Sequence, residues 1–484
     1  MESNRLVHQA IGTSIFLYAI IFFSFLLLQL DIKWVFILSI IWVALILVTF
    51  YPIFSVKESI KGLMYLLVAA TFLNQSVFSI NIDFFQLFFY RLLLLVTAAL
   101  YFFYGVQRKW IIKDIYHFPL KGVWLFFCIW FVYGCISVLW AKSFIDAIKY
   151  MLLLAAGILF IYLSNVILTR ISHILIMYGI WLGMTSILLV LGLVNYYGHI
   201  QLSSSGLFGG AAYKQSYPTA VFFNQNDFAA FLSISFFFYV AAARNCSKKW
   251  SRNSALLLSC ISVYLIYLTE SRASLLAIVV GGISYIFILA NKKVKKIIIT
   301  FFIVSGIAGS FIILPKLVNI LHSWTIMSSV YEHGDLMPSN LARMNLLKNT
   351  FYYVIDTYGF GVGAGNIPYH LEKYSIFPTG GVLQVHNWLA EIAGNFGLFI
   401  LLGYIGMILY LCVSLYRIYT EIHHPAYKML IESCLVGMIA FLASSISPSS
   451  VSNLYFHWVF LGLVTSTVAV FKQMRQKRDK ELLK

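Results

Sequence analysis

The sequence predicts an all-α protein that crosses a membrane many times. Of its 484 residues, 61% are hydrophobic and only 11% are charged, whereas a soluble domain carries roughly 25% charged residues. Long uncharged runs separate the charges, and each run can form the helix of about 20 residues that crosses a bilayer core. An outer-membrane barrel is excluded because its strands would alternate in polarity. A soluble enzyme, a disordered chain and a single-span anchor are excluded by the same observations.

The net charge of +17 raises the question of nucleic-acid binding. When successive spans alternate in direction, 24 of the 34 lysines and arginines fall on one face and nine on the other, while Arg91 lies within a span. This asymmetry is the positive-inside pattern, so we predict that the richer face is cytoplasmic. The basic surplus is therefore a signal of topology, and the expected partner is the lipid bilayer, with no nucleic acid.

About fourteen spans are expected, which makes residues 1–484 one membrane domain with both termini in the cytoplasm. Ser447-Pro448-Ser449-Ser450 supplies the turn that divides the apolar stretch 433–471 into two spans. The expected bounds are 10–30, 34–53, 62–80, 84–105, 120–140, 147–168, 172–194, 218–243, 254–269, 274–290, 297–314, 387–414, 429–446 and 454–471.

Two external segments are longer than a simple connection requires, namely residues 195–217 and 315–385. Long ordered loops often carry function. Within the second, residues 340–357 are predicted to be helical, since Pro338 precedes them and Gly359 follows. Its apolar residues recur at helical spacing: Leu341, Met344, Leu347, Phe351 and Ile355. Such an amphipathic helix would lie on the outer membrane surface or cap a cavity.

Polar groups collect near the external ends of the spans. Each polar group that is retained there requires a structural or functional explanation, because an unpaired charge in lipid costs at least ~2.5 kcal/mol. The candidates lie in the eighth span, between the ninth and tenth, in the long loop, and where the twelfth begins: Asn226, Asp227, Ser271, Arg272, Arg343, His386 and Asn387. We predict that they line one external vestibule.

Two motifs resemble the O-antigen ligase and polysaccharide polymerase superfamily. Its Thr-x-Ser-Arg pattern is present as Thr269-Glu270-Ser271-Arg272, and its His-Asn-x-x-Leu-Glu pattern is similar to residues 386–391, followed by Gly394 and Gly397. Glu391 is displaced by one position from that pattern. Residues 223–229 are similar to its Gly-Asn-Pro-Asn-x-x-Ala segment, with Gln225 in place of Pro, and Arg343 before residues 359–363 resembles its loop arginine. The resemblance covers roughly residues 200–410.

The resemblance implies a GT-C-like fold and glycosyl transfer at the outer face of a bacterial cytoplasmic membrane. A glycan on polyprenyl pyrophosphate would pass to a hydroxyl of an acceptor glycan, without nucleotide, other cofactor or metal. The resemblance implies catalytic roles for His386, Arg272 and Arg343. It implies substrate binding by a second group of residues: Asn387, Ser271, Asn226, Asp227 and Glu391.

These residue types suit that chemistry. Breaking the anomeric C–O bond leaves a charged pyrophosphate, and an arginine such as Arg272 or Arg343 clamps phosphate oxygens bidentately. The acceptor hydroxyl loses its proton, a task for histidine near neutral pH. His386 is the candidate base, although it could instead orient the pyrophosphate. We expect neighbouring Arg272 to lower the pKa of His386.

Each candidate could also have a purely structural role. Arg272 could be a snorkelling cation at a helix end, and His386 an interfacial histidine. Arg343 could pair with Asp335 or Asp356. Asn226 and Asp227 could form a polar clamp between helices. Arg91 could pair with Asp83 or belong to the vestibule.

Two further patterns do not support a site. Residues 361–365 read Gly-Val-Gly-Ala-Gly like a dinucleotide loop, but no strand precedes them, so we expect a tight loop. Glu332-His333 with Asp335 offers an incomplete set of hard ligands, so no metal site is expected.

Three functions remain. The first is an outer-face polymerase that joins lipid-linked repeat units into a capsule, teichuronic acid or O-antigen-like chain. The second is a ligase that transfers finished glycan to a terminal acceptor such as lipid A core. A composition rich in Lys, Ile, Asn, Phe and Tyr hints at an AT-rich, Gram-positive genome and favours the polymerase. The third, from another class, is a lipid-linked sugar flippase, which commonly has charges near the midplane and inverted repeats that this sequence lacks.

Overall fold

The computed structural model describes residues 56–297, 338–448 and 454–482, except for 74–75, 77–78, 83–84, 111–117 and 119, together with 299–300, 303–304 and 450. All but two of the elements in these residues are helices, which confirms the all-α fold class. Their bounds are α3 (Val56–Thr71), β1 (Ser79–Ile82), β2 (Phe85–Phe88), α4 (Phe89–Gln107), α6 (Lys121–Ser137), α7 (Phe144–Ile167), α8 (Ile171–Gly198), η2 (Ala212–Lys214), α9 (Gln225–Asn245), α10 (Lys249–Leu268), α11 (Arg272–Leu289), α13 (Ser339–Asp356), α14 (Ile367–Lys373), α15 (Trp388–Glu421), α16 (Pro425–Ser444) and α17 (Tyr455–Leu482).

Nine helices within the described residues are long and apolar enough to cross a membrane. Eleven of the fourteen predicted spans fall in this part of the chain, and each overlaps a helix. The predicted spans 10–30 and 34–53, and most of 297–314, lie outside the described residues. The chain is thus a polytopic membrane protein.

The predicted C-terminal end of span 62–80 and the predicted N-terminal end of span 84–105 are wrong. Residues 79–82 and 85–88 form two antiparallel strands in which Ser79 pairs with Phe88 and Ile82 with Phe85. The sequence Ser-Ile-Asn-Ile at 79–82 alternates polar and apolar residues, a strand pattern that average hydrophobicity conceals.

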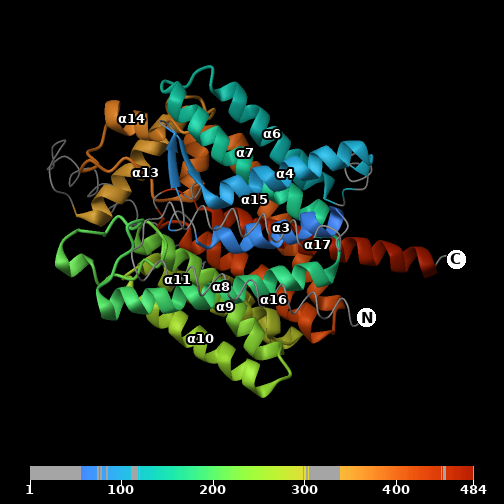
Figure 1. Cartoon of the computed structure of the whole chain (residues 1–484). Coiled ribbons are helices and arrows are strands. Elements are labelled where there is room, and N and C mark those ends of the chain that lie inside the picture. Colours follow the sequence, from blue (N-terminus) through green and yellow to red (C-terminus); the bar gives the residue numbers. More distant parts are fainter. Residues whose placement is uncertain are drawn as a thin grey trace.

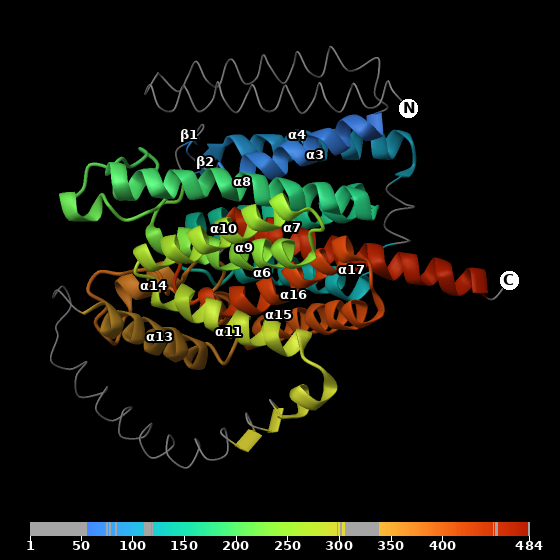
Figure 2. The ribbon, with the colours of Figure 1, turned by 90° about the horizontal axis from the view of Figure 1, so that it is seen from below.

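The helices form one bundle with two different ends (Figures 1 and 2). The loop end, as we call it, carries residues 199–224, 269–271, 338–387 and 445–448. The tail end is the opposite one, where α9 and α15 finish and α17 projects beyond the bundle to the C-terminus. Successive membrane-spanning helices run in alternating directions between the two ends, as the assignment of spans assumed. Which end is cytoplasmic stays a prediction.

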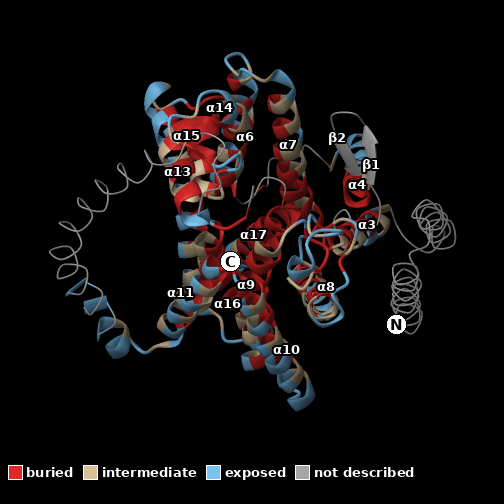
Figure 3. Ribbon diagram, turned by 90° about the vertical axis from the view of Figure 1, so that its left-hand side faces the viewer, coloured by how far each residue is buried: buried red, intermediate tan, exposed pale blue. Residues whose placement is uncertain are grey.

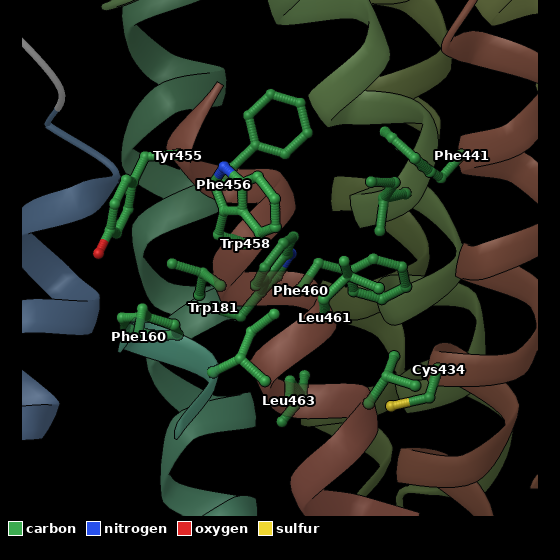
Figure 4. Packing of buried hydrophobic residues seen from close by; sticks show 14 of the residues in the cluster. Phe160, Trp181, Cys434, Phe441, Tyr455, Phe456, Trp458, Phe460, Leu461 and Leu463 are labelled. Carbon is green, nitrogen blue, oxygen red and sulfur yellow. The ribbon is translucent and has the colours of Figure 1, made fainter. Parts of the chain in front are cut away.

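Helix α17 runs through the centre of the bundle, and burial concentrates along it and the neighbouring α7 and α9 (Figure 3). Trp458 of α17 packs on Gly157 of α7, where a Cβ would lie 2.2 Å from the indole. Only glycine permits this close approach. Figure 4 shows Trp458 and Phe460 among the neighbouring aromatic rings, which include Trp181 of α8. Side-chain hydrogen bonds add to this packing, as from Trp181 Nε1 to Ser235 Oγ at 3.0 Å.

Helix α15 is broken near its start. Gly397 has a φ of 80° inside the helix, and residues 359–365, the glycine loop, pack into the break. A Cβ on Gly397 would lie 2.1 Å from the oxygen of Gly359, so no larger residue fits. The amide of Val362 donates to the carbonyl of Gly394 at 2.8 Å and satisfies a group that the break exposes. The glycine loop is therefore a tight structural loop, as predicted.

Helix α13 forms almost where predicted but packs through a different face. Leu347, Phe351 and Ile355 of the predicted apolar stripe are exposed. The buried face carries Asn345 and Asn349, whose side-chain amides donate to backbone carbonyls of residues 377–378 at 2.8 Å. The side-chain oxygen of Asn349 also accepts hydrogen bonds from the amides of Ile376 and Phe377 at 2.9 and 3.0 Å. The exposed apolar stripe is compatible with the predicted helix on a membrane surface.

Candidate functional site

The turn between α10 and α11 presents Arg272 at the loop end. Glu270 has a left-handed φ of 58°, and its carboxylate accepts a hydrogen bond from the Tyr217 hydroxyl at 3.1 Å. Ser271 is buried, and its amide donates to Thr269 Oγ1 at 3.3 Å. Arg272, the first residue of α11, is exposed and forms no ion pair with a carboxylate of the described residues.

The start of α15 presents His386. This residue has a left-handed φ of 55°, which is uncommon outside glycine. Its Nδ1 lies 3.1 Å from the carbonyl oxygen of Ser447. Asn387 caps the helix, because its side-chain oxygen accepts a hydrogen bond from the amide of Ala390 at 3.0 Å. Asn387 therefore fixes the direction in which α15 leaves His386.

The start of α9 brings Asn226 and Asp227 to the same end. Asn224 caps this helix by accepting from the amide of Asp227 at 2.9 Å, and its own amide donates to the Asp227 carboxylate at 3.0 Å. Asn226 instead accepts a hydrogen bond from Ser447 Oγ at 2.9 Å. The two neighbours thus differ in role, since Asp227 stabilises its own helix while Asn226 joins two helices.

Ser447, which follows α16, connects three of the predicted site segments. Its hydroxyl donates to Asn226 and lies 3.2 Å from Ser271 Oγ, and its carbonyl contacts His386. The sequence interpretation assigned this residue only to a turn between two spans. Its partners lie 61, 176 and 221 positions away, so no local pattern reveals them. The one signal that the sequence offers is the run of serines around Pro448 between two apolar spans.

Arg343 approaches the site from α13. Burial lowers the pKa of its guanidinium, which nevertheless stays charged in water. Burial also lowers the pKa of His386, the hydrogen bond to Ser447 raises it, and the charge of Arg343 lowers it, with a net decrease. Arg343, and not Arg272 as expected, is therefore the arginine that disfavours the imidazolium of His386. Arg343 has no ion pair with Asp356.

Glu391 lies apart from the Ser447 contacts. It is buried, and its Oε1 accepts hydrogen bonds from the Tyr150 hydroxyl at 2.9 Å and from Ser450 Oγ at 2.7 Å. These bonds join α15 to α7 and to the segment after α16. Substrate binding by Glu391 stays a prediction.

Several residues named in the sequence interpretation lie outside the described part of the chain. Asp335, Glu332 and His333 belong to this group, and so does Asp83. Arg91 is buried with its guanidinium carbon 4.4 Å from the centre of the Phe88 ring. Among the described residues, no three His, Cys, Asp or Glu side chains come close enough to hold a metal ion.

Two comparisons with known proteins bear on this geometry. The profile of the O-antigen ligase family matches residues 256–405, which include the Thr-x-Ser-Arg turn, Arg343 and His386. The teichuronic acid biosynthesis protein TuaE of Bacillus subtilis (strain 168) is 44% identical over 446 residues, which cover 91% of each chain. The identity extends over most of the protein, well beyond the residues of the motifs. The chain therefore belongs to the O-antigen ligase and polysaccharide polymerase family of membrane proteins, as its motifs suggested.

Proposed function

We propose that this protein polymerises repeat units of a cell-surface polysaccharide on the outer face of the bacterial cytoplasmic membrane. The donor is a glycan on polyprenyl pyrophosphate, and the acceptor is a hydroxyl of a second glycan. Family membership supports an enzyme of the glycosyltransferase type in polysaccharide synthesis. The name of the relative favours teichuronic acid over O-antigen as the product.

Uncompensated positive charge at the loop end carries this proposal. Arg272 and Arg343 form no ion pair with a carboxylate that the structure describes. Residues at or just before the starts of α9, α11 and α15 also meet there around Ser447, namely Asn226, Ser271 and His386. A helix start carries a partial positive charge, so three starts and two guanidinium groups suit an anion with several oxygens. The pyrophosphate leaving group is such an anion.

The transfer step needs no further component. The acceptor oxygen forms a bond to the anomeric carbon, and the bond from that carbon to the phosphate oxygen breaks. The leaving polyprenyl pyrophosphate keeps the electron pair, and the two arginines stabilise its charge. The hydroxyl proton passes to His386, whose lowered pKa favours the neutral imidazole at neutral pH.

Reconstitution tests this function. The purified protein, in vesicles with a synthetic polyprenyl-pyrophosphate-linked repeat unit and no nucleotide sugar, should release polyprenyl pyrophosphate and produce a ladder of longer glycans. Transfer of one preassembled glycan to a terminal acceptor without a ladder would make it a ligase. Movement of the intact donor across the bilayer without transfer would make it a flippase.

Cysteine labelling tests the orientation. In a variant without the six native cysteines, an impermeant thiol reagent on intact cells should label a cysteine at Ser203 or Ser375 but not at Ser251. Ser203 and Ser375 lie at the loop end, whereas Ser251 begins α10 at the tail end. Labelling of Ser251 alone would place the site on the cytoplasmic side and contradict an outer-face polymerase.

A further inference from the structure

The backbone and the side chain of Ser447 act on different parts of the site. Its carbonyl contacts the base candidate, and its hydroxyl contacts two helix starts. We propose that Ser447 is a positioning residue that sets the proton position of His386 and holds this base in register with Arg272. This inference rests on the proposed function.

The carbonyl of Ser447 holds the hydrogen on Nδ1 of His386, and a second backbone hydrogen bond, to Pro448, acts on the same ring. A carbonyl oxygen only accepts hydrogen bonds, so Nδ1 at 3.1 Å must be the donor. In the neutral imidazole the lone pair is then on Nε2. Nε2 is therefore the atom that receives the proton of the acceptor hydroxyl.

The conformation of His386 also depends on the residues after α16. A left-handed φ is unfavourable for a residue with a side chain, so the surroundings of His386 must maintain it. Two hydrogen bonds do so on either side of Asn387: Nδ1 of His386 with the Ser447 carbonyl, and the amide of Trp388 with the Ser445 carbonyl at 3.0 Å. The segment 445–447 thus fixes the ring and the backbone together.

The hydroxyl of Ser447 anchors this segment. It donates to Asn226 at 2.9 Å and contacts Ser271 at 3.2 Å, and Ser271 directly precedes Arg272. A displacement of Ser447 would therefore move the proton acceptor relative to the guanidinium that binds the leaving group. Misplacement by about 1 Å is enough to lower a transfer rate strongly.

Charged groups of both signs belong to the segments that surround His386. The cations include Arg343 and Lys348 of α13 and Arg272 of α11. The carboxylates include Glu270 before α11, Asp227 of α9 and Glu391 of α15, which accept hydrogen bonds from Tyr217, Asn224 and Tyr150. Burial lowers the pKa of His386, as does the charge of Arg343, while the backbone hydrogen bonds to Ser447 and Pro448 raise it.

The test uses Ser447→Ala in the purified full-length protein with the synthetic lipid-linked donor. We expect kcat to fall about tenfold and KM for the donor to stay within about twofold, since the base is displaced while the arginines remain. The acidic limb of the pH profile should move to lower pH, because the weakened hydrogen bond no longer raises the pKa of His386. Ser444→Ala is the matched control, since this buried hydroxyl bonds only within α16, at 3.2 Å to Phe441. It should retain wild-type kcat and pH profile.

Ser447→Thr separates positioning from packing. Threonine keeps the hydroxyl, so it should recover turnover above the alanine variant, whereas a role in packing alone would make the extra methyl group worse than alanine. If Ser447→Ala does not fold, Ser271→Ala removes the same contact from the turn before α11. It should move the acidic limb of the pH profile to lower pH as well. An alanine variant with wild-type kcat and pH profile would overturn the inference. Absence of transfer by the wild-type protein would instead overturn the proposed function.

Discussion

Arg244 at the tail end and Arg272 and Arg343 at the loop end have opposite surroundings. At the tail end, Arg244 pairs with Glu432, which is fully buried and also accepts hydrogen bonds from Asn245 at 2.8 Å and Tyr285 at 2.7 Å. At the loop end, Arg272 and Arg343 have no such carboxylate within the described residues. A buried carboxylate compensates Arg244, whereas no carboxylate of the described residues pairs with Arg272 or Arg343.

The difference indicates where an anionic ligand belongs. A compensated ion pair holds helices together and leaves little charge for a ligand. The loop end does contain carboxylates, but Asp227 and Glu391 are bound by neutral donors. Neither carboxylate pairs with Arg272 or Arg343, which leaves these two arginines available for substrate oxygens.

The largest expected effect follows from removing an uncompensated arginine. Arg272→Ala should lower turnover of the lipid-linked donor by about 10²–10³, because the leaving pyrophosphate loses a donor that acts as its charge develops. Arg272→Lys should recover little, since one ammonium does not reproduce a bidentate fork. The rate at which each purified variant releases polyprenyl pyrophosphate measures its turnover.

Arg252→Ala is the control for this prediction. Arg252 is exposed on α10 at the tail end and has no ion pair with a described residue, so turnover should stay at the wild-type level. Near-normal turnover by Arg272→Lys would contradict the clamp and favour the snorkelling cation.

His386→Gln should lower kcat by about 10² or more while donor binding is largely retained. Glutamine has similar reach and forms hydrogen bonds, but it does not accept the proton of the hydroxyl. Single-turnover transfer together with binding of radiolabelled donor separates the two effects. Loss of donor binding at an unchanged transfer rate would assign His386 to the pyrophosphate instead.

The sequence predicted the members of the site better than their connections. Arg272 and His386 could be found because each stands at a span end within a recognisable motif. The role of Ser447 could not, since its contacts come from tertiary packing between helices distant in sequence. The packed face of α13 could not be predicted for a related reason: Asn345 and Asn349 bond to backbone carbonyls of residues 377–378, which helical periodicity does not encode.

At the tail end, Arg244→Ala should affect stability and not catalysis. The substitution leaves the buried Glu432 without its cation, while Asn245 and Tyr285 still donate to it. Because the Arg244 side chain is 41% exposed, we expect a loss of about 2–3 kcal/mol in the free energy of unfolding, below the range for fully buried pairs. A lower unfolding temperature in detergent, with kcat within twofold of wild type at low temperature, is the expected result. A fall in kcat without a loss of stability would give the tail end a part in transfer.

The smallest expected effect is a shift in pH dependence, which tests how the loop end uses Arg343. If His386 is the base, it must be neutral, so kcat should rise with pH through its pKa and level off above it. Burial and the charge of Arg343 place that pKa below the usual value of about 6.5, so the rise should be centred at a lower pH than for a free histidine. Arg343→Ala removes a cation that disfavours the imidazolium, so the pKa of His386 should increase and the limb should move to higher pH. The alanine variant should then lose severalfold more activity than wild type between neutral and mildly acidic pH, beyond any uniform decrease from the lost pyrophosphate contact.

If the imidazolium instead binds pyrophosphate, activity should fall as pH rises through the pKa of His386, and Arg343→Ala should extend activity to higher pH.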